Sequence, residues 1–154
     1  MGGVIVGVTI CCQKTGASID MGYIGFGLLR DKVAELAGEP FASHIAKLKQ
    51  PPYHLSRFMM SEEDRKKLFD EYDAETQRMI EEKKVSIKLV DFCMQPDAGG
   101  EIHYDACKEL LDVIGDYDDD IAYGYAARRD CAKFADFKEL LQECVEHKCM
   151  LEWW

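Results

Sequence analysis

The stretch that decides the fold is residues 4–21, with the sequence VIVGVTICCQKTGASIDM. Every second residue from Val4 to Ile10 is valine or isoleucine, an alternation typical of a strand with one buried face. The turn-like sequence Lys-Thr-Gly follows at 14–16, and a shorter extended segment runs over 17–21. This pattern predicts a β-hairpin.

Apolar residues recur at helical spacing after the hairpin. The spacing predicts helices that begin near Phe26, at Pro40, at Ser61, near Tyr104 and at Asp136. Ser61 and Asp64 resemble a capping box, with Asp in place of the usual Glu. Residues 51–60 (PPYHLSRFMM) have no clean period, which predicts a loop packed on the rest of the protein.

Extended segments complete the prediction. Alternation over 85–89 predicts a second main strand that continues to Cys93 and is followed by a loop over 95–100. Residues 121–125 predict a brief strand, and 149–154 a final strand in which only one of the two tryptophans is buried. These elements predict one α+β domain over residues 1–154: a small, mostly antiparallel sheet of about 3–5 strands with a single layer of helices packed on it.

The chain is acidic, with 29 Asp and Glu against 19 Lys and Arg and a formal net charge of −10. Such a charge disfavours direct binding to nucleic acid or anionic membranes and favours a basic protein surface as partner. No apolar run is long enough to span a membrane, and residues 4–12 lack the flanks of a signal peptide. Seven cysteines, an odd number without any C-x-x-C, predict reduced thiols in the cytoplasm.

The acidic run at 116–120 (DYDDD) is the first candidate site. Asp116, Asp118 and Asp120 have the spacing of calcium ligands, but Ile121 occupies the position that needs glycine and Ala127 the position of the bidentate glutamate. We therefore predict no bound metal. Asp116, Asp118, Asp119 and Asp120 are instead predicted to contact a partner, the alternative being a solvated loop.

A glycine-rich turn is the second candidate. Gly22, Gly25 and Gly27 precede a helix, where backbone N–H groups can hold phosphate, although the spacing differs from known nucleotide-binding fingerprints. The cations that could complete such a site are Arg30, Lys32, Arg128 and Arg129. The alternative is a tight corner between strand and helix.

Cysteines suggest two further sites. Cys144, His147 and Cys149 form C-x-x-H-x-C, but a fourth zinc ligand is not evident nearby, so we predict no zinc and no other cofactor. Cys93, Asp97 and His103 form a compact set that could supply a nucleophile, an orienting acid and a base. The alternative is a buried cysteine beside a turn.

The conspicuous aromatic residues are Tyr123-Gly124-Tyr125 and Trp153-Trp154. Aromatic faces can stack on ring-shaped ligands, and an exposed Trp154 is a candidate contact for a partner protein. Packing at the edge of the sheet is the alternative for both pairs.

The sequence from Phe92 onward resembles small uncharacterised acidic proteins of Firmicutes and their phages. The resemblance covers Pro96-Asp97-x-Gly99-Gly100-Glu101, the acidic run, Tyr123-Gly124-Tyr125, the segment FADFKELL at 134–141, Cys144, Cys149 and the terminal tryptophan. Those proteins carry Ser-Asp-Cys-Asp-Gly-Glu at 96–101, so this chain lacks their loop thiol. The resemblance implies no function, but a phage setting favours a protein that blocks a host defence.

These observations favour a non-enzymatic interaction protein. It would present the acidic run and the helix at 62–82 to a basic surface of a partner, as an inhibitor or adaptor, an anti-defence protein or a nucleic-acid mimic. The first alternative is a domain that binds a small anionic ligand such as a nucleotide at the glycine turn. The second is a hydrolase or transferase that depends on Cys93.

Overall fold

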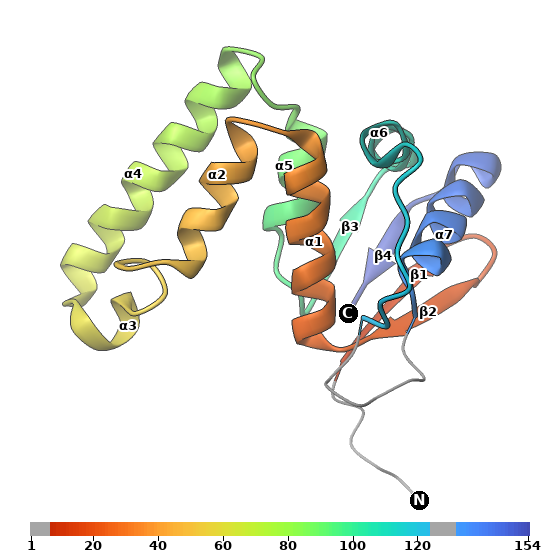
Figure 1. The fold of residues 1–154 in the computed structure, drawn as a ribbon, viewed down its shortest axis with the longest axis horizontal. Helices are drawn as coiled ribbons and strands as arrows, with labels where there is room; N and C mark the ends of the chain where they lie inside the picture. The colour runs from red at the N-terminus through yellow and green to blue at the C-terminus, as the bar shows by residue number, and fades with distance from the viewer. Residues whose placement is uncertain (1–6, 124–131) are drawn as a thin grey trace, which may run out of the picture.

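The sheet has four strands in the order β2-β1-β4-β3, and each neighbouring pair is antiparallel (Figure 1). The computed structural model describes residues 7–123 and 132–154. Within them the strands are β1 (Val8–Cys12), β2 (Ser18–Met21), β3 (Gly100–Ile102) and β4 (Leu151–Trp153). The predicted hairpin is confirmed as β1 and β2, although residues 4–6 lie outside the described part. The predicted C-terminal strand is confirmed as β4.

Seven α-helices and one short 3-10 helix make up most of the described chain. They are α1 (Tyr23–Ala37), α2 (Phe41–Ala46), η1 (Lys47–Lys49), α3 (Ser56–Met59), α4 (Glu62–Glu81), α5 (Ile87–Met94), α6 (Tyr104–Ile114) and α7 (Phe134–His147). The α+β class and the antiparallel sheet of 3–5 strands are therefore confirmed.

One face of the sheet is buried beneath helices. Its side chains are at most 3% exposed and belong to Val8, Ile10, Cys12, Met21, Ile102, Leu151 and Trp153. The residues that alternate with them, such as Thr9, Asp20 and Glu101, are half-buried or exposed. Helices α1, α5, α6 and α7 lie on the buried side (Figure 1), which agrees with the predicted single layer.

Trp153 lies at the centre of this core. Its indole ring contacts the rings of Phe26 and Phe92, with centroids 5.6 Å and 5.8 Å away, and its Nε1–H donates a hydrogen bond to the Pro96 carbonyl at 2.9 Å. Trp154, by contrast, is 56% exposed. The prediction that only one of the two tryptophans is buried is confirmed.

Residues 41–81, which comprise α2, η1, α3 and α4, extend away from the sheet, and we call them the arm (Figure 1). Ser61 caps α4 as predicted, since its hydroxyl accepts a hydrogen bond from the Asp64 N–H at 3.1 Å. Buried His44 joins α2 to α4: its Nε2 lies 2.6 Å from the Thr76 hydroxyl, and the Tyr72 hydroxyl donates to its carbonyl at 2.6 Å. The arm is therefore fixed by a small polar core.

The strand predicted over 85–93 is wrong, because this segment forms helix α5. The Ser86 hydroxyl caps the helix by accepting a hydrogen bond from the Lys88 N–H at 3.2 Å. Val85, Leu89 and Phe92 are buried while Ile87 is 56% exposed, so the apolar residues follow helical rather than alternating spacing.

Smaller corrections concern the ends of elements. The predicted loop at 51–60 contains the short helix α3, and β3 begins at Gly100, where a loop was expected. Helix α7 begins at Phe134, and Asp136 lies at its third position, where its carboxylate accepts from the Lys133 N–H at 2.8 Å. The brief strand at 121–125 is reduced to a bridge between Ala122 and Lys133, and Tyr125 lies outside the described residues.

Candidate functional site

The acidic run follows α6, and its aspartates differ in environment. Asp116, Asp118 and Asp120 are exposed. Asp119 is half-buried, and its carboxylate accepts hydrogen bonds from the hydroxyls of Tyr117 and Tyr123 at 2.8 Å and 2.7 Å. Asp119 therefore organises the loop, while the other three side chains face solvent.

The pKa values of both tyrosines are raised in this arrangement. Burial, followed by the hydrogen bond to Asp119, raises the pKa of Tyr123, and the hydrogen bond to Asp119 is the main cause of the raised pKa of Tyr117. Lys138 donates to the carbonyls of Gly115 and Tyr117 at 3.2 Å each. The loop is thus held by Tyr117 of the run itself and by Tyr123 and Lys138, which follow it in the chain.

Within residues 7–123 and 132–154, little positive charge offsets the exposed carboxylates. Lys133 lies 3.9 Å from Asp120, whose side chain is fully exposed, so this ion pair is weak. Among the described residues, none forms an ion pair with Asp116 or Asp118. These three carboxylates do not come together as a metal-binding group in the described structure.

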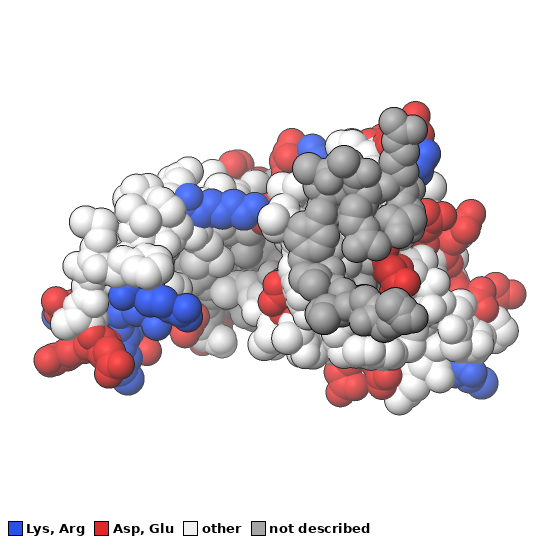
Figure 2. Space-filling model, turned by 90° about the horizontal axis from the view of Figure 1, so that it is seen from below, with Lys and Arg blue, Asp and Glu red and all other residues white. Residues whose placement is uncertain are grey.

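Helix α4 supplies a second acidic surface. It carries eight acidic and four basic side chains, and only Tyr72, Thr76 and Met79 are buried. Lys66 pairs with Asp70, and Lys47 of η1 with Glu75. Figure 2 shows acidic side chains at the outer end of the arm, on the left, beside uncharged and basic ones.

The outer end of the arm also carries an exposed apolar group, which we call the apolar tip and which consists of Leu55, Phe58 and Met59. Their exposed fractions are 37%, 83% and 75%. The tip is held against α4, because Arg65 donates from Nε to the Ser56 hydroxyl at 3.2 Å. Sequence reasoning missed this group. Four apolar residues at 55–60 without a clean period were the available signal.

Trp154 is the remaining predicted contact residue. Its backbone exchanges two hydrogen bonds with Thr9, at 2.9 Å and 3.1 Å, which extends the pairing of β1 and β4. Its exposed indole is therefore attached to a rigid backbone.

The glycine turn uses its own polar groups. The Gly22 N–H donates to the Tyr123 carbonyl at 3.0 Å, and Gly25 and Gly27 lie within α1. Arg30 donates from one guanidinium nitrogen to the carbonyls of Gln95 and Phe92, at 2.5 Å and 3.4 Å, and its guanidinium lies 4.6 Å from the centre of the Phe26 ring. Burial lowers its pKa. Lys32 pairs with Glu35. Arg128 and Arg129 lie outside the described residues.

Cys93, Asp97 and His103 each have other partners. The Cys93 thiol lies 3.7 Å from the Arg30 carbonyl, and burial raises its pKa to about 12, which makes it a poor nucleophile at neutral pH. His103 caps α6 through Nδ1, which accepts from the Asp105 N–H at 3.2 Å. The charge of Asp97 acts on Arg30. Among the described residues, no hydrogen bond joins Cys93 to His103.

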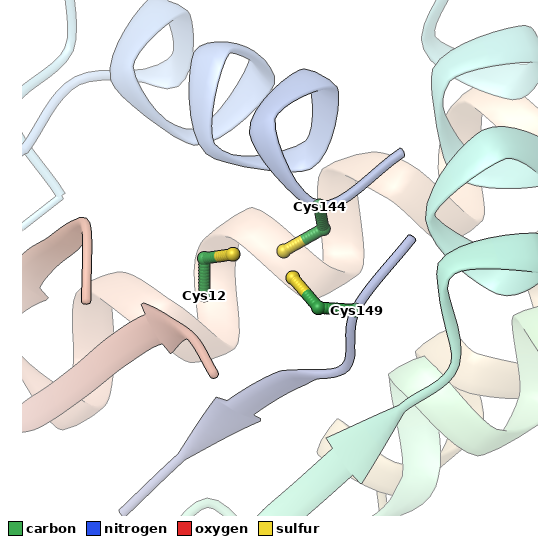
Figure 3. A group of neighbouring side chains, drawn as sticks. All are labelled: Cys12, Cys144 and Cys149. Atoms are coloured by element: carbon green, nitrogen blue, oxygen red, sulfur yellow. The ribbon is translucent and has the colours of Figure 1, made fainter. Parts of the chain in front are cut away.

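The two cysteines and the histidine of the C-x-x-H-x-C segment have different neighbours in the structure. Cys144 and Cys149 meet Cys12 of β1, and the three sulfur atoms lie within 4.8 Å of one another (Figure 3). His147 faces Glu143 instead, at 3.4 Å. The predicted zinc set is therefore not assembled as such, and Cys12 is a neighbour that sequence spacing could not indicate.

Cys12 has an unusual environment for a buried thiol. Burial would raise its pKa, but hydrogen bonds from Cys149, from the Thr15 side chain and from the backbone of residues 14 and 15 lower the pKa to about 7. Cys107 interacts with Cys144 and, together with burial, raises the pKa of that thiol.

Comparison of the chain with protein families, curated proteins and solved structures gave no match in any of the three. Within the described part, no helix combines the length and the apolar character that crossing a membrane requires.

Proposed function

We propose that this protein is a non-enzymatic interaction protein that binds a basic surface of a partner protein, as an inhibitor or adaptor in the cytoplasm. The arm carries the proposal: a helix of 20 residues stands away from the sheet, has three buried residues and bears twice as many acidic as basic side chains. A helix with so little buried surface contributes little to the core, so its exposed face is available for recognition.

The apolar tip strengthens the proposal. Interfaces combine an aromatic anchor that becomes fully buried with a polar or charged rim. Phe58 at 83% exposure and Met59 at 75% would supply the anchor, and the acidic first turn of α4, residues 62–64, would supply the rim. A basic partner with an apolar pocket is the chemistry that matches both.

The acidic run and Trp154 would form a second contact region. A partner that normally binds nucleic acid would meet carboxylates where it otherwise meets phosphates, which is the basis for proposing an anti-defence protein or nucleic-acid mimic. Asp116, Asp118 and Asp120 would take part directly, and Asp119 through its support of the loop.

The two alternatives receive less support. A nucleotide site at the glycine turn would compete with the hydrogen bonds that Gly22 and Arg30 already make to carbonyl groups. A Cys93-dependent enzyme would need a base at the thiol, and the contact described for that sulfur is a backbone carbonyl.

Affinity capture from a host lysate tests the proposal. Glu63, Glu71 and Asp73 are exposed on α4 and form no ion pair with any described residue, so the triple variant Glu63→Gln, Glu71→Gln, Asp73→Asn removes three charges from the arm. Each exposed pair contributes about 0.2–1 kcal/mol, and the variant should weaken binding by about 0.6–3 kcal/mol. Phe58→Ala should weaken it by about 2 kcal/mol if the ring is an anchor.

The matched control removes three exposed charges from α6 and α7, outside the arm, through Asp112→Asn, Glu139→Gln and Glu146→Gln. It should leave capture by the arm unchanged. Capture should also weaken as salt rises from about 0.05 to 0.5 M, because exposed charges are screened. The proposal would be contradicted if partner binding changed neither with salt nor with the triple variant in α4.

A further inference from the structure

Three thiols from two distant parts of the chain meet in the core. Cys12 ends β1, Cys144 lies in the last turn of α7, and Cys149 follows the left-handed residue Lys148 that reverses the chain. The Cys149 N–H donates to the Cys144 carbonyl at 3.1 Å, which fixes the reversal. The side chains point toward one another in Figure 3, and the sulfur atoms lie within 4.8 Å of each other.

The donor set is sulfur alone. Among the described residues, no imidazole or carboxylate joins this group, and His147 is engaged with Glu143. Thiolates select soft cations such as copper(I) and zinc(II) over hard cations, which prefer oxygen. Structural zinc sites hold four protein ligands. Cys107 interacts with Cys144 but does not belong to the group whose sulfur atoms all lie within 4.8 Å of one another, so the site offers three thiolates, which suits copper(I).

The surroundings suit a thiolate site. All three cysteines are buried, and their sulfur atoms are close enough to contact one ion. A hollow of about 400 Å³ beside the cluster is lined by Gln13, Lys14, His103, Tyr104, Lys148, Cys149 and Met150. An ion could therefore reach Cys149 from solvent.

We propose that Cys12, Cys144 and Cys149 bind one copper(I) ion in a three-coordinate thiolate site. Binding replaces thiol protons by the metal, with no change in the oxidation state of sulfur. The site is independent of the arm and of the proposed partner contact, so either proposal can fail alone.

The test is a titration of the reduced protein with copper(I) in the absence of oxygen, against a chelator that reports free copper(I). We expect one ion per chain, ultraviolet absorption from thiolate-to-copper charge transfer, and a higher melting temperature of the wild-type protein. X-ray absorption spectroscopy of that complex should give three sulfur neighbours. This measurement needs no variant.

Cys149→Ser removes a ligand at the edge of the core. It should lower copper(I) affinity by more than the roughly 10–100-fold that loss of an outer-shell group costs. Cys11→Ser is the matched control, because Cys11 adjoins Cys12 but points to the opposite face of β1, and it should bind as the wild type does.

Failure of the wild-type protein to retain copper(I) would overturn the proposal. Wild-type affinity in Cys149→Ser, or an equal loss in Cys11→Ser, would do the same. Zinc(II) bound by these cysteines in place of copper(I) would overturn the identity of the ion.

Discussion

Replacing Gly100 with alanine is expected to destabilise the protein by about 3 kcal/mol. Gly100 pairs with Trp153 across β3 and β4, and the indole ring covers its α-carbon. A β-carbon at this position would lie 2.7 Å from Nε1 of Trp153 and closer still to Cε2 and Cζ2. Something in the core would have to move.

The indole has little room to yield. Trp153 is 1% exposed, lies against Phe26 and Phe92, and donates its hydrogen bond to Pro96. Overpacking of a filled core costs about 1–3 kcal/mol, and loss of the hydrogen bond about 1 kcal/mol more. A loss of about 3 kcal/mol corresponds to a melting temperature lower by about 6–12 °C for a protein of this size.

Urea unfolding followed by circular dichroism measures the effect. The matched control is Gly27→Ala in α1, where a β-carbon meets no atom within 4 Å. Alanine is the better helix former, so this variant should gain about 0.5–1 kcal/mol. A wild-type free energy of unfolding in Gly100→Ala would refute the packing described for Trp153, as would an equal loss in both variants.

Three further predictions concern titration, reactivity and the acidic run. Burial lowers the pKa of His44, so below about pH 6.5 the unfolded chain takes up a proton at this residue that the folded protein excludes. The free energy of unfolding should therefore fall as the pH drops, with His44 contributing up to about 1.4 kcal/mol per pH unit. In His44→Gln, urea unfolding across pH 5–8 should show a shallower slope, and an unchanged slope would contradict this assignment. A thiol reagent at pH 7 should modify Cys93 far more slowly in the native protein than in urea, and equal rates, measured by mass spectrometry, would exclude its burial. Asp119→Ala should lower the free energy of unfolding by about 2 kcal/mol, because two tyrosine hydroxyls lose a charged acceptor. Asp120→Ala should change it by less than about 0.5 kcal/mol. Similar losses for the two variants in urea titrations would argue against different roles for Asp119 and Asp120.

Sequence signals within a few residues predicted the elements that depend on neighbouring residues. The hairpin of β1 and β2 has β-branched alternation and a turn sequence, and Ser61 provides the hydroxyl that its helix start needs. Such features depend on neighbours within a few residues, so they are visible in the sequence.

The segment at 85–93 shows where this reasoning fails. Val85, Ile87 and Leu89 alternate, but the longer pattern of Val85, Leu89 and Phe92 has helical spacing, and Ser86 is a suitable cap. A short apolar segment satisfies both periods. Its packing against α1 and α6 favours the helix.

The candidate sites differ in the same way. The acidic character of α4 was evident from composition, whereas the inward direction of Asp119 depends on Tyr123, four residues on and fixed by the tertiary fold. The thiol cluster joins Cys12 to Cys144 and Cys149 across most of the chain. Only strand pairing and the packing of α7 on β1 bring them together.

The position of β4 has a consequence for biosynthesis. This strand lies between β1 and β3 but comes from residues 151–153, after every other strand and helix described. During synthesis, the hairpin of β1 and β2 therefore emerges from the ribosome long before β4, which pairs with β1. Val8 and Ile10, which are buried in the folded protein, are only partly buried during that interval. The nascent chain should need chaperone protection until β4 inserts, and pairing over so long a separation should make this insertion the slow step of folding.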